Sequence, residues 1–152
     1  MNDKNTTTGM KKRIALIVLG TMLLMMGLAA CGDKEPQTAT LKLSANPTTG
    51  YEWSFTQTPT IFDISSEYVQ DETDEEMVGV GGIETFTLTP TKAGSTEINF
   101  YYKQPWDEDS LDTHLTYQIS VDKNMQITVD SMNGEIPGDA SAVPEVPELV
   151  IE

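Results

Sequence analysis

Residues 95–103 read STEINFYYK, and residues 114–121 read HLTYQISV. Successive side chains of a β-strand point to opposite faces of a sheet, so apolar residues at every second position are typical of strands with one buried face. Both stretches follow this pattern, with apolar side chains at Ile98, Phe100, Tyr102, Leu115, Tyr117, Ile119 and Val121. They therefore predict two strands of a sheet that covers a hydrophobic core.

The same period of two recurs elsewhere in the chain. It appears in TLKLSA (40–45), YEWSF (51–55) and ETFTLT (84–89), while IFDISSEYV (61–69) and MQITV (125–129) complete about seven strands. No window shows the 3.6-residue apolar stripe of an amphipathic helix. Seven short strands within roughly ninety residues predict an all-β fold, an immunoglobulin-like antiparallel β-sandwich of about seven strands.

The first thirty residues predict a lipoprotein signal peptide rather than a part of the fold. A basic run, KKR (11–13), precedes apolar residues 14–30, a run that is short for a membrane span. The run ends in LAACG (28–32), which resembles the lipobox of bacterial lipoproteins, where Cys31 is lipidated and becomes the mature N-terminus. We therefore expect an extracytoplasmic protein anchored by lipid to a bacterial membrane. An ordinary secretory cleavage site or an uncleaved anchor is the alternative, and Met10 is a second candidate start.

Cysteine and histidine are too scarce for most catalytic and metal sites. Cys31 is the only cysteine and His114 the only histidine. A lipidated Cys31 leaves no thiol for a disulfide, a Cys–His dyad or a zinc cluster. The chain has no G-x-S-x-G sequence for a serine nucleophile, and the pattern around His114 indicates a half-exposed strand residue. The sequence therefore predicts a protein that is not an enzyme and needs no cofactor or metal.

The chain is strongly acidic, with a formal net charge of −15 at pH 7. Removal of the signal would leave 5 Lys against 23 Asp and Glu, a net charge of −18. Binding to nucleic acid depends on Lys and Arg that neutralise phosphates, so nucleic acid is excluded as a partner. An acidic surface keeps a tethered protein soluble, and it also speeds encounter with a basic partner.

Composition divides the mature chain into three parts. Residues 31–38 contain the lipidated cysteine and a polar tether, and residues 39–130 are long enough for one domain with its own core. Residues 131–152, SMNGEIPGDASAVPEVPELVIE, are rich in Pro and Gly and predict a disordered acidic tail.

One loop between the predicted strands combines stiffness with small side chains. In NPTTGY (46–51), Pro47 fixes its own φ and pushes Asn46 toward extended geometry, while Gly50 permits a positive φ. This composition predicts a stiff, protruding turn with Thr48 and Thr49 near its tip. An ordinary hairpin turn is the alternative interpretation.

Two further loops carry unusual residues. GVGG (79–82) lacks the side chains that would keep its backbone away from another surface. In KQPWDEDS (103–110), Pro105 stiffens the chain beside Trp106, whose large apolar area makes it a candidate interface anchor. Taken singly, GVGG is also consistent with a flexible link, and Trp106 is also consistent with a lid over the end of the sandwich.

Together and in this order, the three loops resemble those of one family. NPTTGYEW (46–53), GVGG followed by ETFTLTPTKAGSTEINFYY (84–102), and QPW (104–106) are similar to the three inhibitory loops of the chagasin family of cysteine-peptidase inhibitors. The resemblance covers residues 40–122. It implies an immunoglobulin-like sandwich that blocks papain-like cysteine peptidases reversibly and competitively, and we expect the protein to act as a monomer.

The resemblance also implies which residues contact the peptidase. The first loop would lie over the catalytic cysteine of the peptidase, with the second loop on one side and the third on the other. The implied inhibitory residues are Asn46, Pro47, Thr48, Thr49, Gly50, Tyr51, Gly79, Val80, Gly81, Gly82, Gln104, Pro105 and Trp106.

The third loop departs from the family pattern at one position. This chain has Gln104 where the family usually has Arg before Pro-Trp. An Arg side chain is permanently charged and offers five donors, whereas Gln offers one neutral amide. Loss of a charge-assisted contact predicts binding weaker by about 1–2 kcal/mol, roughly tenfold, and a different target preference.

Two other classes of function remain open at the level of the sequence. A non-inhibitory surface module for adhesion or glycan capture would keep the same fold and the lipid anchor. A calcium-dependent domain would use the acidic runs DETDEE (71–76) or DEDSLD (107–112), although neither matches an EF-hand loop.

Overall fold

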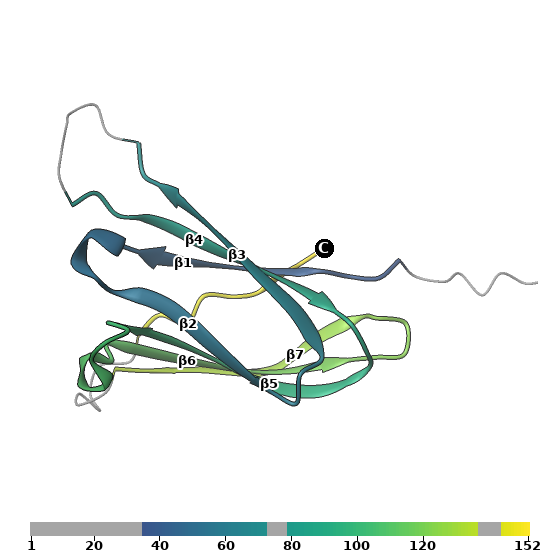
Figure 1. Cartoon of the computed structure of the whole chain (residues 1–152). Helices are drawn as coiled ribbons and strands as arrows, with labels where there is room; N and C mark the ends of the chain where they lie inside the picture. Colours follow the sequence, from purple (N-terminus) through teal and green to yellow (C-terminus); the bar gives the residue numbers. More distant parts are fainter. Residues whose placement is uncertain (1–34, 73–78, 137–143) are drawn as a thin grey trace, which may run out of the picture. The chain divides into compact units, whose positions relative to one another are not determined.

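Two four-stranded sheets form the fold in the computed structural model, which describes residues 35–72, 79–136 and 144–152 (Figure 1). Every strand pairing within the two sheets is antiparallel. The strands are β1 (Ala39–Ala45), β2 (Glu52–Thr58), β3 (Phe62–Gln70), β4 (Gly82–Pro90), β5 (Gly94–Lys103), β6 (Thr113–Val121), β7 (Ile127–Glu135) and β8 (Val150–Ile151).

The strands are distributed between the sheets as in an immunoglobulin-like sandwich. One sheet has the order β3-β4-β1-β8, and the other has the order β2-β5-β6-β7. Consecutive strands β1 and β2 therefore lie in different sheets, as do β2 and β3. The predicted all-β antiparallel sandwich is confirmed, with one strand more than the seven that the sequence indicated.

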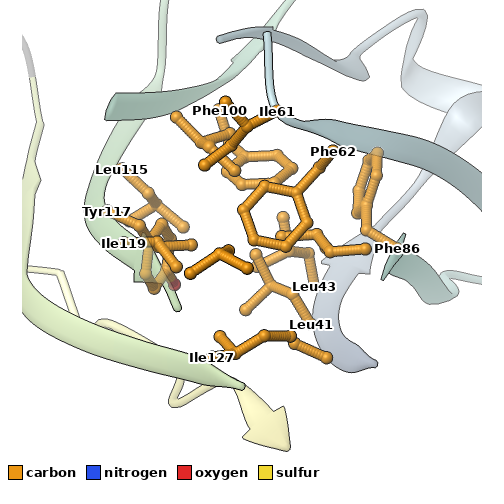
Figure 2. Close-up of a cluster of buried hydrophobic side chains, with 14 residues drawn as sticks. Leu41, Leu43, Ile61, Phe62, Phe86, Phe100, Leu115, Tyr117, Ile119 and Ile127 are labelled. Atoms are coloured by element: carbon orange, nitrogen blue, oxygen red, sulfur yellow. The ribbon is translucent and has the colours of Figure 1, made fainter. Parts of the chain in front are cut away.

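The core lies between the two sheets and is built from the residues that alternate along the strands. Fourteen buried apolar side chains form one cluster (Figure 2). From β1, Leu41 is 0% and Leu43 is 2% exposed, and the β5 residue Phe100 is 0% exposed. The ring of Phe100 packs edge-on against Tyr117 of β6, with centroids 5.9 Å apart. Alternation in the sequence thus identified the buried faces of β1, β4, β5 and β6.

The strand β2 is buried less completely than its alternation predicts. Trp53 is half-buried against the core and Phe55 is 38% exposed. Because β2 is the edge strand of its sheet, it has a neighbour, β5, on one side only. The apolar side chains of an edge strand are therefore covered by fewer neighbouring residues than those of a central strand.

The prediction of a disordered tail is wrong for residues 131–135 and 144–152. Residues 131–135 continue β7, and β8 pairs antiparallel with β1 through Ala39↔Ile151 and Thr40↔Val150. The side chains of Val146, Leu149 and Ile151 pack against the core.

The C-terminal segment, residues 144–152, is fixed at two further points. The Tyr117 hydroxyl donates a hydrogen bond to the carbonyl of Pro147 at 2.7 Å, and burial raises the pKa of Tyr117. A Cβ at Gly134 would lie 2.8 Å from Val146 Cγ2, so this segment packs directly on β7. Its Pro-rich composition is compatible with an extended segment, and the tertiary contacts supply the order that composition does not predict.

The predicted tether is attached to the domain from residue 35 onward. The Gln126 side-chain amide donates to the carbonyl of Glu35 at 2.9 Å, and Gln37 Oε1 accepts from the backbone of Ile127 at 2.8 Å. Cys31 and the predicted signal peptide lie outside the described residues. Within the ranges that the structure describes, no helix is both long and apolar enough to cross a membrane.

Candidate functional site

The three loops singled out in the sequence leave the same end of the sandwich (Figure 1). We call them the central loop (residues 46–51), the glycine loop (79–82) and the tryptophan loop (104–106). The central loop is not a hairpin turn, because it joins β1 of one sheet to β2 of the other. The glycine loop leads into β4 and includes its first residue, Gly82, and the tryptophan loop directly follows β5, so each is attached to a strand of one sheet.

The central loop forms one tight turn. Residues Pro47–Thr49 form a 3₁₀ helix, with Pro at a first-turn position where a missing N–H costs nothing. Gly50 ends it with φ 81°, a conformation that glycine adopts without strain, and its N–H donates to the Pro47 carbonyl at 3.0 Å. The side chains of Pro47, Thr48 and Thr49 are exposed. The prediction of a stiff turn with small residues at its tip is confirmed.

Both threonine hydroxyls of the central loop bond within the loop itself. Thr48 Oγ1 donates to Asn46 Oδ1 at 2.6 Å, and Thr49 Oγ1 donates to the Asn46 carbonyl at 2.6 Å. The Thr49 hydroxyl also accepts from the N–H of Tyr51 at 3.4 Å. These hydroxyls therefore hold the turn together, which sequence reasoning did not anticipate.

The glycine loop is tied to the central loop. Asn46 Nδ2 donates to the Gly79 carbonyl at 3.0 Å, although the two residues are 33 positions apart. Gly79 has φ 86°, and a Cβ there would be 3.8 Å from Thr48 Oγ1. A Cβ at Gly82 would lie only 2.3 Å from the Val69 carbonyl. At least one glycine of GVGG is therefore required by the β3–β4 pairing itself rather than by an approaching surface.

The tryptophan loop presents the most exposed aromatic side chain of the described residues. Trp106 is 72% exposed, and a Cβ at Gly50 would lie 2.7 Å from its ring, so the indole passes directly over the central loop. Gln104 Nε2 donates to the Thr49 carbonyl at 3.3 Å. The residue that replaces the family arginine thus makes an internal contact between two loops.

Tyr102 of β5 supports the central loop from the side of the sandwich. The sequence pattern assigned Tyr102 only to the core face of its strand. Its hydroxyl accepts the N–H of Asn46 at 3.0 Å. Its ring packs on Tyr51 and Trp53, with centroids 5.4 and 4.9 Å away. Trp53 Nε1 donates in turn to the Ser44 carbonyl at 2.9 Å. The run of aromatics in NPTTGYEW is the sequence signal that could have revealed this cluster.

Acidic side chains flank the site on two sides. The Asp71 N–H donates to the carbonyl of Gly81 in the glycine loop at 3.0 Å, and Asp107 and Asp109 follow Trp106 in the sequence. The Asp107 side chain accepts the N–H of Asp109 at 3.0 Å, and Glu108 pairs with Lys103 Nζ at 2.6 Å. No group of three metal-ligating side chains occurs in the part of the chain that the structure describes. Residues 73–76 of the DETDEE run lie outside it.

His114 lies on β6 as the half-exposed strand residue that its pattern predicts. Its Nδ1 lies 2.7 Å from Glu135 Oε1, and its Nε2 lies 2.8 Å from Asn99 Oδ1. Its ring stacks on Tyr101 with centroids 4.7 Å apart. Both ring nitrogens are therefore used in contacts between β5, β6 and β7.

Sequence comparison decides the family. Residues 34–121, more than half of the chain, match the Chagasin family peptidase inhibitor I42. The chain belongs to the chagasin family. Because that family consists of peptidase inhibitors, membership in it confirms the prediction that this protein is an inhibitor and not an enzyme.

Two individual proteins are similar to this chain. Chagasin of Trypanosoma cruzi is 32% identical over 79 residues, which cover 48% of this chain and 70% of chagasin. Amoebiasin-1 of Entamoeba histolytica is 32% identical over 79 residues, covering 52% of this chain and 76% of amoebiasin-1.

Two solved structures are also similar. A cysteine protease inhibitor from Entamoeba histolytica matches with a TM-score of 0.49 and 28% identity, covering 55% of this chain and 77% of the inhibitor. Amebosin matches with a TM-score of 0.41 and 26% identity over the same shares of the two chains. The chagasin-family match ends at residue 121, so β7 and the C-terminal segment lie beyond it.

Proposed function

We propose that this chagasin-family chain is a reversible, competitive inhibitor of papain-like cysteine peptidases, and that its three loops occlude the active-site cleft. The central loop would lie over the catalytic cysteine of the peptidase, between the glycine loop and the tryptophan loop. The residues assigned to this contact are Pro47, Thr48, Thr49, Gly50, Tyr51, Gly79, Val80, Gly81, Gly82, Gln104, Pro105 and Trp106, with Asn46 at their base.

The observation that carries the proposal is the convergence of the three loops. Their sequences lie more than twenty positions apart, yet hydrogen bonds join Asn46 to Gly79 and Gln104 to Thr49. Trp106 projects beside the central loop with 72% of its surface exposed. A large exposed aromatic on a braced loop is the arrangement of an interface anchor, because little side-chain entropy is lost when it is buried.

The geometry of the central loop suits a peptidase cleft without making it a substrate. A peptidase cleaves a peptide bond that it can hold in attack geometry against its thiolate. Residues Pro47–Thr49 form a hydrogen-bonded turn rather than an extended strand. The loop would therefore fill the cleft while withholding a scissile bond. Since it offers no group that forms a stable thiolate adduct, inhibition is reversible.

The test is titration of residues 32–152 into active-site-calibrated papain. This part of the chain retains the compact unit Lys34–Glu152, with both sheets and the whole core. We expect competitive inhibition by the wild type. Thr49→Arg, which adds bulk at an exposed tip, should weaken inhibition by roughly thirtyfold, corresponding to a hot-spot effect of about 2 kcal/mol.

Thr128→Arg is the matched control, because Thr128 is an exposed threonine of β7, a strand that takes no part in the three loops. It makes the same change in charge and size and should leave inhibition unchanged. Equal effects of the two variants would contradict the three-loop mode. Absence of inhibition by the folded wild type, with papain and with cathepsin-like enzymes, would favour the non-inhibitory surface module.

We further propose that the mature protein is a monomer anchored outside the cytoplasm by lipid on Cys31. The proposal rests on the basic run, the apolar run and the LAACG sequence that precede the domain. Expression of the full chain in a bacterium with labelled palmitate should label the wild type and leave Cys31→Ser unlabelled. Cys31 is the only cysteine. Label on the Cys31→Ser protein would therefore show that the lipid is attached to another type of residue, which would reject Cys31 as the site. Light scattering on residues 32–152 should give the mass of a single copy.

A further inference from the structure

We infer that Asn46 is a positioning residue, which holds the central and glycine loops in one arrangement instead of contacting the peptidase. The inference rests on the proposed inhibitory function and assigns a different role to one of its motif residues. Asn46 is half-buried, whereas Pro47, Thr48 and Thr49 beside it are exposed.

All four polar groups of Asn46 are occupied within the protein. Its backbone N–H donates to the Tyr102 hydroxyl at 3.0 Å, and its carbonyl accepts from the N–H of Thr49 at 3.1 Å and from the Thr49 hydroxyl. Its side-chain Nδ2 donates to the Gly79 carbonyl, and its Oδ1 accepts from the Thr48 hydroxyl. Each of these groups therefore has a partner within the protein before any peptidase binds.

The chemistry of the neighbours determines the orientation of the Asn46 amide. The Gly79 carbonyl can only accept a hydrogen bond, so the atom that faces it at 3.0 Å must be the Nδ2 donor. This leaves Oδ1 for the Thr48 hydroxyl, which can donate. Aspartate in this position would keep the acceptor for Thr48 and would place an oxygen against the Gly79 carbonyl. Asparagine therefore meets both requirements, and its nearest isostere meets only one.

This network gives Thr48 an indirect role. Its hydroxyl proton is already donated to Asn46, at 2.6 Å. Thr48→Val removes that bond while keeping the shape of the side chain. Its effect on inhibition should therefore depend on the presence of the Asn46 side chain.

The first test compares Asn46→Asp with Asn133→Asp in residues 32–152, against papain. Asn133 is exposed on β7, so the control adds the same charge away from the loops. Loss of one hydrogen bond from a preorganised loop should raise the inhibition constant roughly twofold to tenfold for Asn46→Asp. The control should leave it unchanged. An unchanged constant for Asn46→Asp would overturn the inference.

The second test is a double-mutant cycle between Asn46→Ala and Thr48→Val. If Thr48 acts through Asn46, Thr48→Val should have little further effect once the Asn46 side chain is removed. Thr48→Ser, which keeps the hydroxyl, should weaken inhibition less than Thr48→Val does. Multiplicative effects of the two single changes would show that the Thr48 hydroxyl meets the peptidase directly, which contradicts the inference.

Amide NMR relaxation of the unbound protein gives a readout that does not depend on inhibition. Asn46→Asp should lower the order parameter of Gly79, whereas Thr49, which bonds to the backbone carbonyl of residue 46, and core amides such as those of Leu41 and Phe100 should stay rigid. If wild type inhibits no peptidase but this change occurs, the proposed function fails and the positioning role stands. Unchanged order at Gly79 would reject the positioning role even if inhibition is confirmed.

Discussion

The interior of the sandwich and its loop end are stabilised in opposite ways. Interior side chains such as Phe100 and Leu41 are completely buried and belong to one apolar cluster. The loop end presents exposed residues, such as Thr48, Thr49 and Trp106, and a few hydrogen bonds and special backbone angles hold it in place. Burial of apolar area supplies most of the stability of a fold, whereas exposed loop contacts add little to it.

This difference separates stability from function. Changes in the interior should alter the free energy of unfolding and leave the inhibition constant of folded molecules unchanged. Changes at the loop end should alter the inhibition constant and leave the free energy of unfolding almost unchanged. A rigid scaffold with mobile or variable surface loops is the usual basis for this division, because loops can vary without loss of the core.

The largest effect should come from Phe100→Ala. Phe100 is 0% exposed, and its ring contacts Phe55, Phe86 and Tyr117. Truncation leaves a cavity and should lower the free energy of unfolding in urea by about 3–5 kcal/mol. Phe55→Ala, at a partly exposed ring, should cost clearly less. A Phe100→Ala protein that folds but no longer inhibits would contradict the separation of stability from inhibition. If Phe100→Ala does not fold, the milder variant Phe100→Leu takes its place in this test.

Removal of residues 144–152 should have the next largest effect. The half-buried side chains of Val146, Leu149 and Ile151 and the pairing of β8 with β1 are lost. We expect a decrease in the free energy of unfolding of about 2–4 kcal/mol, less than full burial of three such residues would give. Val150→Ala, at a 55% exposed position, should change stability little. A truncated protein as stable as the wild type would show that the segment is not part of the stabilising interior.

Trp106→Ala tests the loop end. Loss of an exposed anchor should weaken inhibition of papain by about 2 kcal/mol, roughly thirtyfold. Its unfolding midpoint should stay close to that of the wild type, because most of the indole is already in water. Met132→Ala removes an exposed apolar side chain from β7 and should affect neither quantity. A large loss of stability in Trp106→Ala would mean that this residue is a lid over the sandwich rather than an anchor.

The smallest effect should come from Tyr117→Phe, and it should depend on pH. The variant loses the hydrogen bond to the Pro147 carbonyl, which should cost about 1 kcal/mol at pH 7. Burial raises the pKa of Tyr117 above its ordinary value of 10.0, so the unfolded chain releases this proton at a lower pH than the folded protein does. Stability from this group is therefore complete below pH 10 and falls as the pH rises above it.

Unfolding in urea at pH 7 and at pH 10.5 checks this expectation. The difference between wild type and Tyr117→Phe should narrow at the higher pH. The inhibition constant at pH 7 should be the same for both proteins. A difference that stays constant across this range would show that Tyr117 ionises as readily in the folded protein as in the unfolded chain.

Local sequence patterns were sufficient for the strands and for the choice of loops. Alternation identified the buried faces that contain Leu41, Phe86 and Ile119, because side-chain direction in a strand depends only on position along the chain. Pro47 and Gly50 predicted the stiff turn, because their effects on φ are local. The family resemblance of the three motifs agreed with the family that sequence comparison shows.

Contacts between distant residues were beyond the reach of those patterns. Nothing local to residues 144–152 distinguishes a free tail from an ordered segment, because its partners lie elsewhere in the chain, at Tyr117 and in β1. The same holds for Asn46, whose amide meets Gly79 only after β1 has paired with β4, which places Ala45 opposite Gly82. The sequence by itself determined the strands, their buried faces and the family. Only the tertiary structure decided which motif residues face outward and which hold the loops in place, because hydrogen bonds and burial arise from packing between segments rather than from order along the chain.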